Sequence, residues 1–270
     1  MTTATLTPTH PAQPKRRRAG RSFRALLASE VRLFLRDPGA VFFGLAFPTV
    51  LLVGVGFIIP GMREPITDLP APWAGRQPVH IFLPVVLATA AATVALSTLP
   101  VFLATYREQG VLRRLSTTPM RPQGVLAAQL VINVGALVAA AALGVTVAAL
   151  VFGAPAPAQP VVALLAFVLA AAAIFGVGLI IAAVATKGST ASGIGSLVLF
   201  PMMVFAGVWT PGPMMPEGLA DVSVYTPVGA GSQALTTAWF SADFPLTAVL
   251  VMVAYSVLLF PVAAKLFRWR

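Results

Sequence analysis

The chain has 270 residues, of which 58% are hydrophobic and only 10% charged, and its mean hydropathy of +0.89 lies far outside the usual range of soluble proteins. This composition excludes an ordinary soluble enzyme and predicts an all-α integral membrane protein. The net charge of +10 does not indicate nucleic-acid binding, because no soluble domain is present to carry a basic surface. The absence of cysteine excludes disulfides and thiolate metal sites, and we expect no metal on this chain.

The first 37 residues are expected to lie on the cytoplasmic face. Residues 1–21 are predicted to be a disordered basic tail, whose Lys and Arg cluster serves either as a topology signal or as a contact for anionic lipids. In residues 22–37, apolar side chains recur at steps of three and four, which predicts an interfacial amphipathic helix. Glu30 falls on the apolar side of this helix. Its carboxylate therefore either stays in water or pairs with a basic residue of this chain or of a cytoplasmic subunit.

A transmembrane domain is predicted over residues 40–265. Its apolar runs each have about 18 residues or more, enough for a helix to cross a bilayer, and they are continuously apolar rather than alternating. The sequence therefore predicts six transmembrane helices, at about residues 40–60, 79–103, 124–152, 161–185, 193–210 and 245–264.

The distribution of basic residues predicts the orientation of the chain. With the N-terminus inside, every Lys and Arg except Arg63 and Arg76 falls in a cytoplasmic segment, as expected for a membrane protein. Both termini are then cytoplasmic. So is the polar segment 104–119 between the second and third spans.

The interiors of the predicted spans contain no Asp, Glu, Lys, Arg or His, because His80 lies at an outer end and His10 in the tail. This excludes a Ser-His-Asp or zinc-dependent intramembrane enzyme and disfavours a carrier driven by protons or sodium. The chain also lacks the phosphate-binding pattern G-x-x-x-x-G-K-[ST], so ATP hydrolysis is expected on another chain.

Residues 209–216 contain too much Pro and Gly for a span, yet they are too apolar for a free loop. We expect a re-entrant or interfacial hairpin before the last span. Trp209, Met214 and Met215 are its candidate outer gate. Alternatively, Trp209 and Trp239 are ordinary aromatic anchors at the membrane boundary.

Two groups of motifs carry a resemblance to a known family. The first is an amphipathic helix ending in Arg36-Asp37-Pro38, followed after two spans by Arg107-Glu108-x-Gly110-x-Leu112-Arg113-Arg114-Leu115 and then Thr118-Pro119. The second runs from Phe205-Ala206-Gly207-Val208-Trp209 to Tyr225-Thr226-Pro227-Val228. In this order the motifs resemble permease subunits of type 2 ABC exporters, in particular those for drugs and antibiotics.

The resemblance implies a homodimer of permeases in a bacterial plasma membrane, docked to two cytoplasmic ATPase subunits that hold ATP and Mg. It also implies that segment 104–119 contains the coupling helix. The candidate coupling residues are Glu108, Gly110, Arg113, Arg114 and Glu30. For the arginines of this segment, the alternative is a role in topology and lipid contact alone.

The resemblance further implies a transport route at the dimer interface, between the second and fifth spans. Its candidate residues are Ser97, Phe102, Ser196, Phe200, Met203 and Phe205, although ordinary helix packing is the alternative for each. Their apolar character suits a hydrophobic or amphipathic cargo such as a drug, an antibiotic or a lipid. For the whole chain, the alternative is a membrane scaffold or immunity protein that transports nothing.

Overall fold

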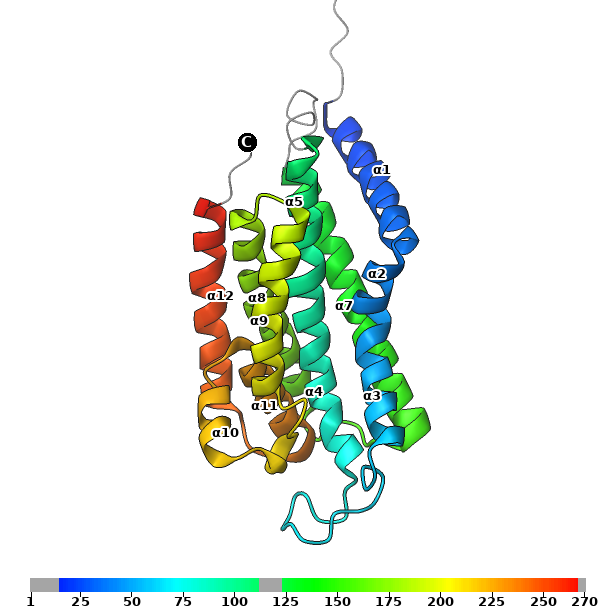
Figure 1. The fold of residues 1–270 in the computed structure, drawn as a ribbon, viewed down its shortest axis with the longest axis vertical. Coiled ribbons are helices and arrows are strands. Elements are labelled where there is room, and N and C mark those ends of the chain that lie inside the picture. The colour runs from blue at the N-terminus through cyan, green and yellow to red at the C-terminus, as the bar shows by residue number, and fades with distance from the viewer. Residues whose placement is uncertain (1–14, 112–122, 267–270) are drawn as a thin grey trace, which may run out of the picture.

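The computed structural model describes residues 15–111 and 123–266, and in these residues the secondary structure is entirely helical. The helices lie side by side in one elongated bundle (Figure 1). This confirms the predicted all-α fold with six helices long and apolar enough to cross a membrane. They are Pro38–Ile58, Pro78–Glu108, Ala127–Phe152, Pro160–Val184, Gly188–Ala206 and Leu246–Leu266.

The N-terminal helix α1 spans Lys15–Arg36 and leans away from the bundle at one end (Figure 1). It begins earlier than predicted, so residues 15–21 are helical rather than part of a disordered tail. Its buried Phe34 packs against Ile132 and Ala136 of α7 (Gln123–Phe152). Burial of Phe34 in this contact holds α1 against the third span.

The first two spans are each interrupted by a wide helical turn just before a proline. The first consists of α2 (Pro38–Val41), η1 (Phe42–Ala46) and α3 (Phe47–Ile58), with Pro48 following the wide turn η1. The second span repeats this arrangement around Pro100, and its parts are α4 (Pro78–Thr93), η2 (Val94–Thr98) and α5 (Leu99–Glu108). Proline cannot donate a backbone hydrogen bond, and a π turn accommodates the resulting break in the ladder.

The second span forms the centre of the bundle, since 94% of its most apolar window is buried. Two glycines on neighbouring helices allow those helices to pack closely against the second span. A Cβ at Gly178 of α8 (Pro160–Val184) would overlap the carbonyl oxygen of Ala95, and one at Gly195 of α9 (Gly188–Ala206) would overlap that of Leu96. Close backbone approach at small residues is the usual means of packing helices in membranes.

The chain between the fifth and sixth spans contains a buried helix that was not predicted from the sequence. After Gly207, whose φ is +86°, come η3 (Gly212–Met214), α10 (Glu217–Ser223) and α11 (Pro227–Phe240), and then α12 (Leu246–Leu266). The sequence predicts only an outer loop over most of this stretch. Instead, α11 packs against α4, α8, α9 and α12. The predicted hairpin 209–216 is a turn that includes η3, and its re-entrant position in a membrane stays a prediction.

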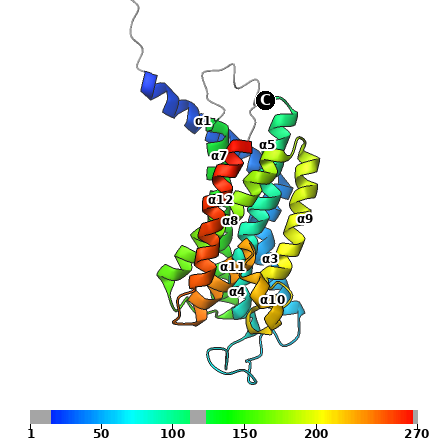
Figure 2. The ribbon, with the colours of Figure 1, turned by 90° about the vertical axis from the view of Figure 1, so that its left-hand side faces the viewer.

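The segments predicted to be cytoplasmic gather at one end of the bundle. The helix α1, the end of α5, the start of α9 and the end of α12 lie at this end in both views, whereas α10 and the loop after α3 lie at the other (Figures 1 and 2). The alternation of the spans therefore agrees with the distribution of basic residues. Which end faces the cytoplasm stays a prediction.

Candidate functional site

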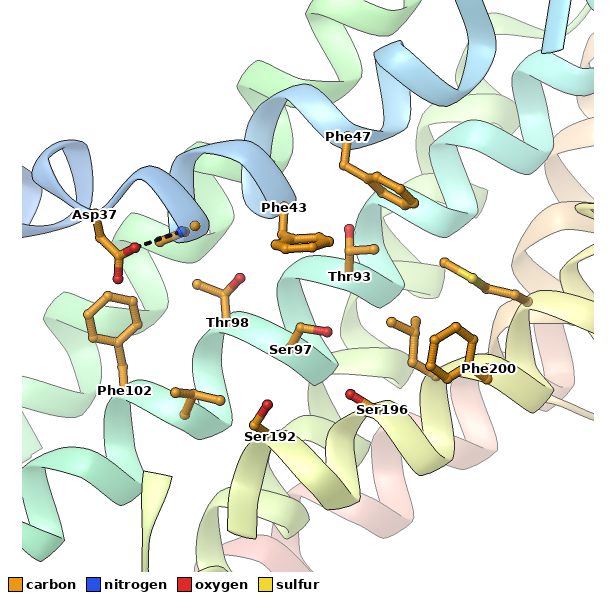
Figure 3. Close-up of a pocket in the computed structure, with 15 residues that line it drawn as sticks. Asp37, Phe43, Phe47, Thr93, Ser97, Thr98, Phe102, Ser192, Ser196 and Phe200 are labelled. Atoms are coloured by element: carbon orange, nitrogen blue, oxygen red, sulfur yellow. Dashed lines mark hydrogen bonds between the residues drawn. The ribbon is translucent and has the colours of Figure 1, made fainter. Parts of the chain in front are cut away.

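A cavity of about 590 Å³ lies between the first, second and fifth spans (Figure 3). This volume is typical of sites that bind small organic molecules. The residues that line the cavity come from α2, η1, α3, α4, η2, α5 and α9, together with Asp37. They are Asp37, Gly39, Ala40, Phe43, Phe47, Thr93, Ser97, Thr98, Val101, Phe102, Ser192, Ser196, Leu199, Phe200 and Met203.

The structure brings the predicted pathway residues together with one exception. Ser97 and Phe102 line one wall, and Ser196, Phe200 and Met203 line another. Phe205 does not line the cavity and lies beside α10, where its carbonyl oxygen accepts a hydrogen bond of 2.6 Å from Ser223. The contribution of the first span was not anticipated, because its phenylalanines read as ordinary apolar span residues.

Four hydroxyl groups face each other across the cavity, Ser97 and Thr98 from the second span and Ser192 and Ser196 from the fifth (Figure 3). Some serine and threonine side chains in other helices bond back to the preceding turn, and Ser256, for example, donates to the carbonyl oxygen of Met252 at 2.8 Å. Others, such as Thr49 and Thr89, have no partner among the described residues. These four hydroxyls form no hydrogen bond with any residue that the structure describes, whereas Thr93, the fifth hydroxyl-bearing residue of the lining, donates to the carbonyl oxygen of Ala90 at 3.0 Å. They are therefore available to a molecule inside the cavity.

Hydrogen bonds at the end of α5 join it to α1, α8 and α9, and through Glu30 of α1 to α7. The first residue of α5 in this group is Tyr106. Its hydroxyl donates to Oε2 of Glu30 in α1 at 2.6 Å, and Nε2 of Gln129 in α7 donates to the same oxygen at 2.7 Å. Glu30 is only 6% exposed. The prediction that it needs a partner is confirmed, and the alternative that it stays in water is wrong. Its partners among the described residues are neutral groups rather than a basic side chain.

The next two residues of α5 extend this joint to the fourth and fifth spans. Nη1 of Arg107 donates to the carbonyl oxygens of Ala185 at 2.6 Å and Ala182 at 3.1 Å, at the C-terminal end of α8. Glu108 accepts a bond of 3.1 Å from the amide of Gly188, the first residue of α9. Each charge has the sign that suits the helix end it contacts. We call Tyr106, Arg107 and Glu108, with these partners, the second-span joint.

Gly110 lies in the turn that follows the last residue of α5, Glu108. Its φ is +65°, and its amide donates to the carbonyl oxygen of Arg107 at 3.1 Å. Only glycine adopts this left-handed conformation without strain, and the space around it is open. Arg113 and Arg114 lie outside the described residues. The coupling role of all four predicted residues of this segment, and of Glu30, stays a prediction.

The outer-gate candidates are partly exposed, with Trp209 and Met214 open to the surface and Met215 packed close to Gly207. Trp239 differs from a boundary anchor, because it is buried and its indole donates to the carbonyl oxygen of Pro155 at 3.0 Å. Gating by the first three residues stays a prediction.

The six apolar spans of the described residues, with a cavity between them and a hydrogen-bonded joint at one end, are those of a multi-pass membrane protein. Over the described residues, no group of His, Asp or Glu is placed to hold a metal ion. Residues 21–240 match the family described as ABC-2 type transporter, and the chain belongs to that family. It is thus the permease component of an ABC transporter, a component that associates with an ATPase subunit and is not itself a nucleotide-binding domain. Among curated proteins there is no match to this chain.

Proposed function

We propose that this permease exports hydrophobic or amphipathic molecules from the cytoplasm through the cavity. ATP and Mg are held by a separate ATPase subunit, which acts on segment 104–119. The observation that carries the proposal is the cavity itself. It lies between the spans expected to form the route, and it is lined by the expected residues except Phe205.

The lining of the cavity supports this class of cargo. Phe43, Phe47, Phe102 and Phe200 offer aromatic surface, and Met203 adds a flexible thioether that adapts to ligands of different shape. Hydroxyl groups provide the few polar contacts. A site of this kind favours a molecule with a large apolar part, whereas a sugar chain would leave most of its hydroxyls without partners.

The second-span joint supports coupling through segment 104–119. This segment begins in α5, and the joint connects the end of α5 to α1, α7, α8 and α9. Helix α9 forms one wall of the cavity, and α1 leads directly into the first span, which forms another. A displacement of the coupling segment by an ATPase would therefore reach two walls of the cavity.

The surface around the cavity supports a second permease copy as its cover. Phe200 is 63% exposed and Leu197 is 75% exposed, and both lie on the fifth span. A homodimer formed through this face would enclose the cavity and place two ATPase subunits at the same end. Membrane lipids would contact the remaining apolar faces, and nucleic acid has no role in this account.

Filling the cavity should stop transport without preventing assembly. In Ser196→Trp, the indole would occupy the space that cargo needs, so transport should fall by about tenfold or more, which corresponds to about 1.4 kcal/mol or more of lost cargo binding. The measurement is ATP-driven movement of a panel of amphiphiles in vesicles that contain the permease and its ATPase. Val257→Trp is the matched control, because residue 257 is 65% exposed on α12, a helix that does not line the cavity.

The ATPase should copurify with both tryptophan variants. If Ser196→Trp transports as fast as wild type, cargo does not pass through the cavity. An assembled wild-type complex that moves no member of the panel would instead favour the scaffold or immunity protein.

A further inference from the structure

Among its described lining residues, the cavity contains one ionisable side chain, that of Asp37. We propose that the cargo is a cationic amphiphile, and that the carboxylate of Asp37 binds its positively charged group. This inference rests on the proposed function, because it assigns a chemical class to the molecule that the cavity carries.

One oxygen of Asp37 is available for such a contact. Oδ1 accepts a hydrogen bond of 3.0 Å from the amide of Ala40 and thereby caps the first span. Oδ2 accepts none from the residues that the structure describes. Asp37 and Phe102 both line the cavity and are drawn at the same end of it (Figure 3). A carboxylate and an aromatic ring at one end of a cavity suit an organic cation, since both attract positive charge.

The charge balance of the lining also favours a cation over an anion. No Lys, Arg or His is among the described residues that line the cavity, and the exposed Arg32 and Arg36 of α1 are outside this lining. The walls are largely apolar, and such walls concentrate the field of a charge at the mouth of a cleft. An anion would meet Asp37 with no compensating cation among the described lining residues.

The hydroxyl groups lie between two apolar parts of the cavity. Phe102 lies at the end near Asp37, the hydroxyls of Ser97, Thr98, Ser192 and Ser196 lie in the middle, and Phe47 and Phe200 lie farther along (Figure 3). A molecule with its cationic group at Asp37 would place its hydrogen-bonding groups at these hydroxyls. Its apolar end would then lie against Phe47 and Phe200.

The capping role of Asp37 can be separated from a role in binding. Asparagine caps helices about as well as aspartate, so Asp37→Asn should keep the bond to Ala40 while removing the charge. A suitable control is Asp221→Asn, which removes an exposed carboxylate in α10 at the opposite end of the bundle. If Asp37 serves only as a cap, neither variant will alter ligand binding.

The experiment measures binding of tetraphenylphosphonium, tetraphenylborate and neutral triphenylphosphine oxide to the full chain in phosphatidylcholine nanodiscs. Each value is corrected for partition into empty nanodiscs. We expect Asp37→Asn to weaken tetraphenylphosphonium binding by only about three- to tenfold, because Asp37 is exposed to water. Binding of triphenylphosphine oxide should be unchanged, and Asp221→Asn should behave as wild type.

A further variant, Phe200→Ala, separates the two levels of the proposal, since it should weaken all probes that occupy the cavity. If Phe200→Ala weakens binding but Asp37→Asn does not alter the phosphonium affinity, the cavity remains the cargo site and the cationic class is wrong. The same conclusion follows if wild type binds the borate as tightly as the phosphonium, or binds no phosphonium. If neither Phe200→Ala nor Ser196→Trp affects any bound probe, the proposed function itself is wrong.

Discussion

Glu30→Ala should lower the free energy of unfolding by about 2–4 kcal/mol, because one buried and one half-buried donor would lose their acceptor. These are the hydroxyl of Tyr106 and the amide of Gln129, which both bond to Oε2 of Glu30. The same change would separate α1 from the end of α5. We therefore also expect a loss of ATP-driven transport in vesicles that contain the ATPase.

Glu30→Gln is the matched variant for this prediction. Since a single oxygen accepts both bonds, the amide oxygen of glutamine can replace it, and the cost should be only about 1 kcal/mol. The measurement is denaturant or thermal unfolding of the purified chain in detergent. Equal destabilisation by alanine and glutamine would show that the charge, rather than the shared acceptor, maintains this contact.

Gly195→Ala should destabilise the bundle by about 3 kcal/mol or more, although alanine is the better helix former. The added methyl group would overlap the carbonyl oxygen of Leu96, and a backbone atom at the centre of the bundle cannot move aside as a side chain can. The yield of folded protein in the membrane and its unfolding temperature in detergent measure this effect.

Gly193→Ala provides the control for Gly195→Ala on the same helix. A Cβ at Gly193 would meet nothing within 4 Å, so this variant should be neutral or more stable by about 0.5–1 kcal/mol. If both variants lose the same stability, backbone contact between α9 and the second span does not explain the requirement for glycine.

The positions of the spans could be predicted from the sequence because a continuous apolar run is a local signal. The helix α11 carries no such signal, since its 14 residues are too short to span and are rich in Gly, Ala, Ser and Thr. Its burial depends on packing against four other helices. The wide turns before Pro48 and Pro100 were also missed, because proline marks a break but not the geometry that repairs it.

The candidate site shows the same division between local and long-range information. The helical period of α1 places Glu30 on the buried side, but its partners Tyr106 and Gln129 lie 76 and 99 residues away. Likewise, the sequence around Arg107 does not indicate that its side chain binds the carbonyl oxygens at the end of α8, because the two segments meet only in the folded chain. The second and fifth spans were identified as cavity walls through the family resemblance. Nothing local distinguishes Phe43 or Phe47 of the first span as their counterpart.

The absence of cysteine from this chain permits the most direct test of transport through the cavity. In Ser196→Cys, a maleimide carrying a bulky group would block the cavity after folding, so that assembly and obstruction are separated. The labelled permease is then combined with unlabelled ATPase, and ATP-driven movement of amphiphiles into vesicles is measured. Wild type treated with the same reagent and labelled Val257→Cys are the controls. We predict that labelling at residue 196 abolishes transport while the ATPase still binds, and undiminished transport by fully labelled protein would contradict a route through this cavity.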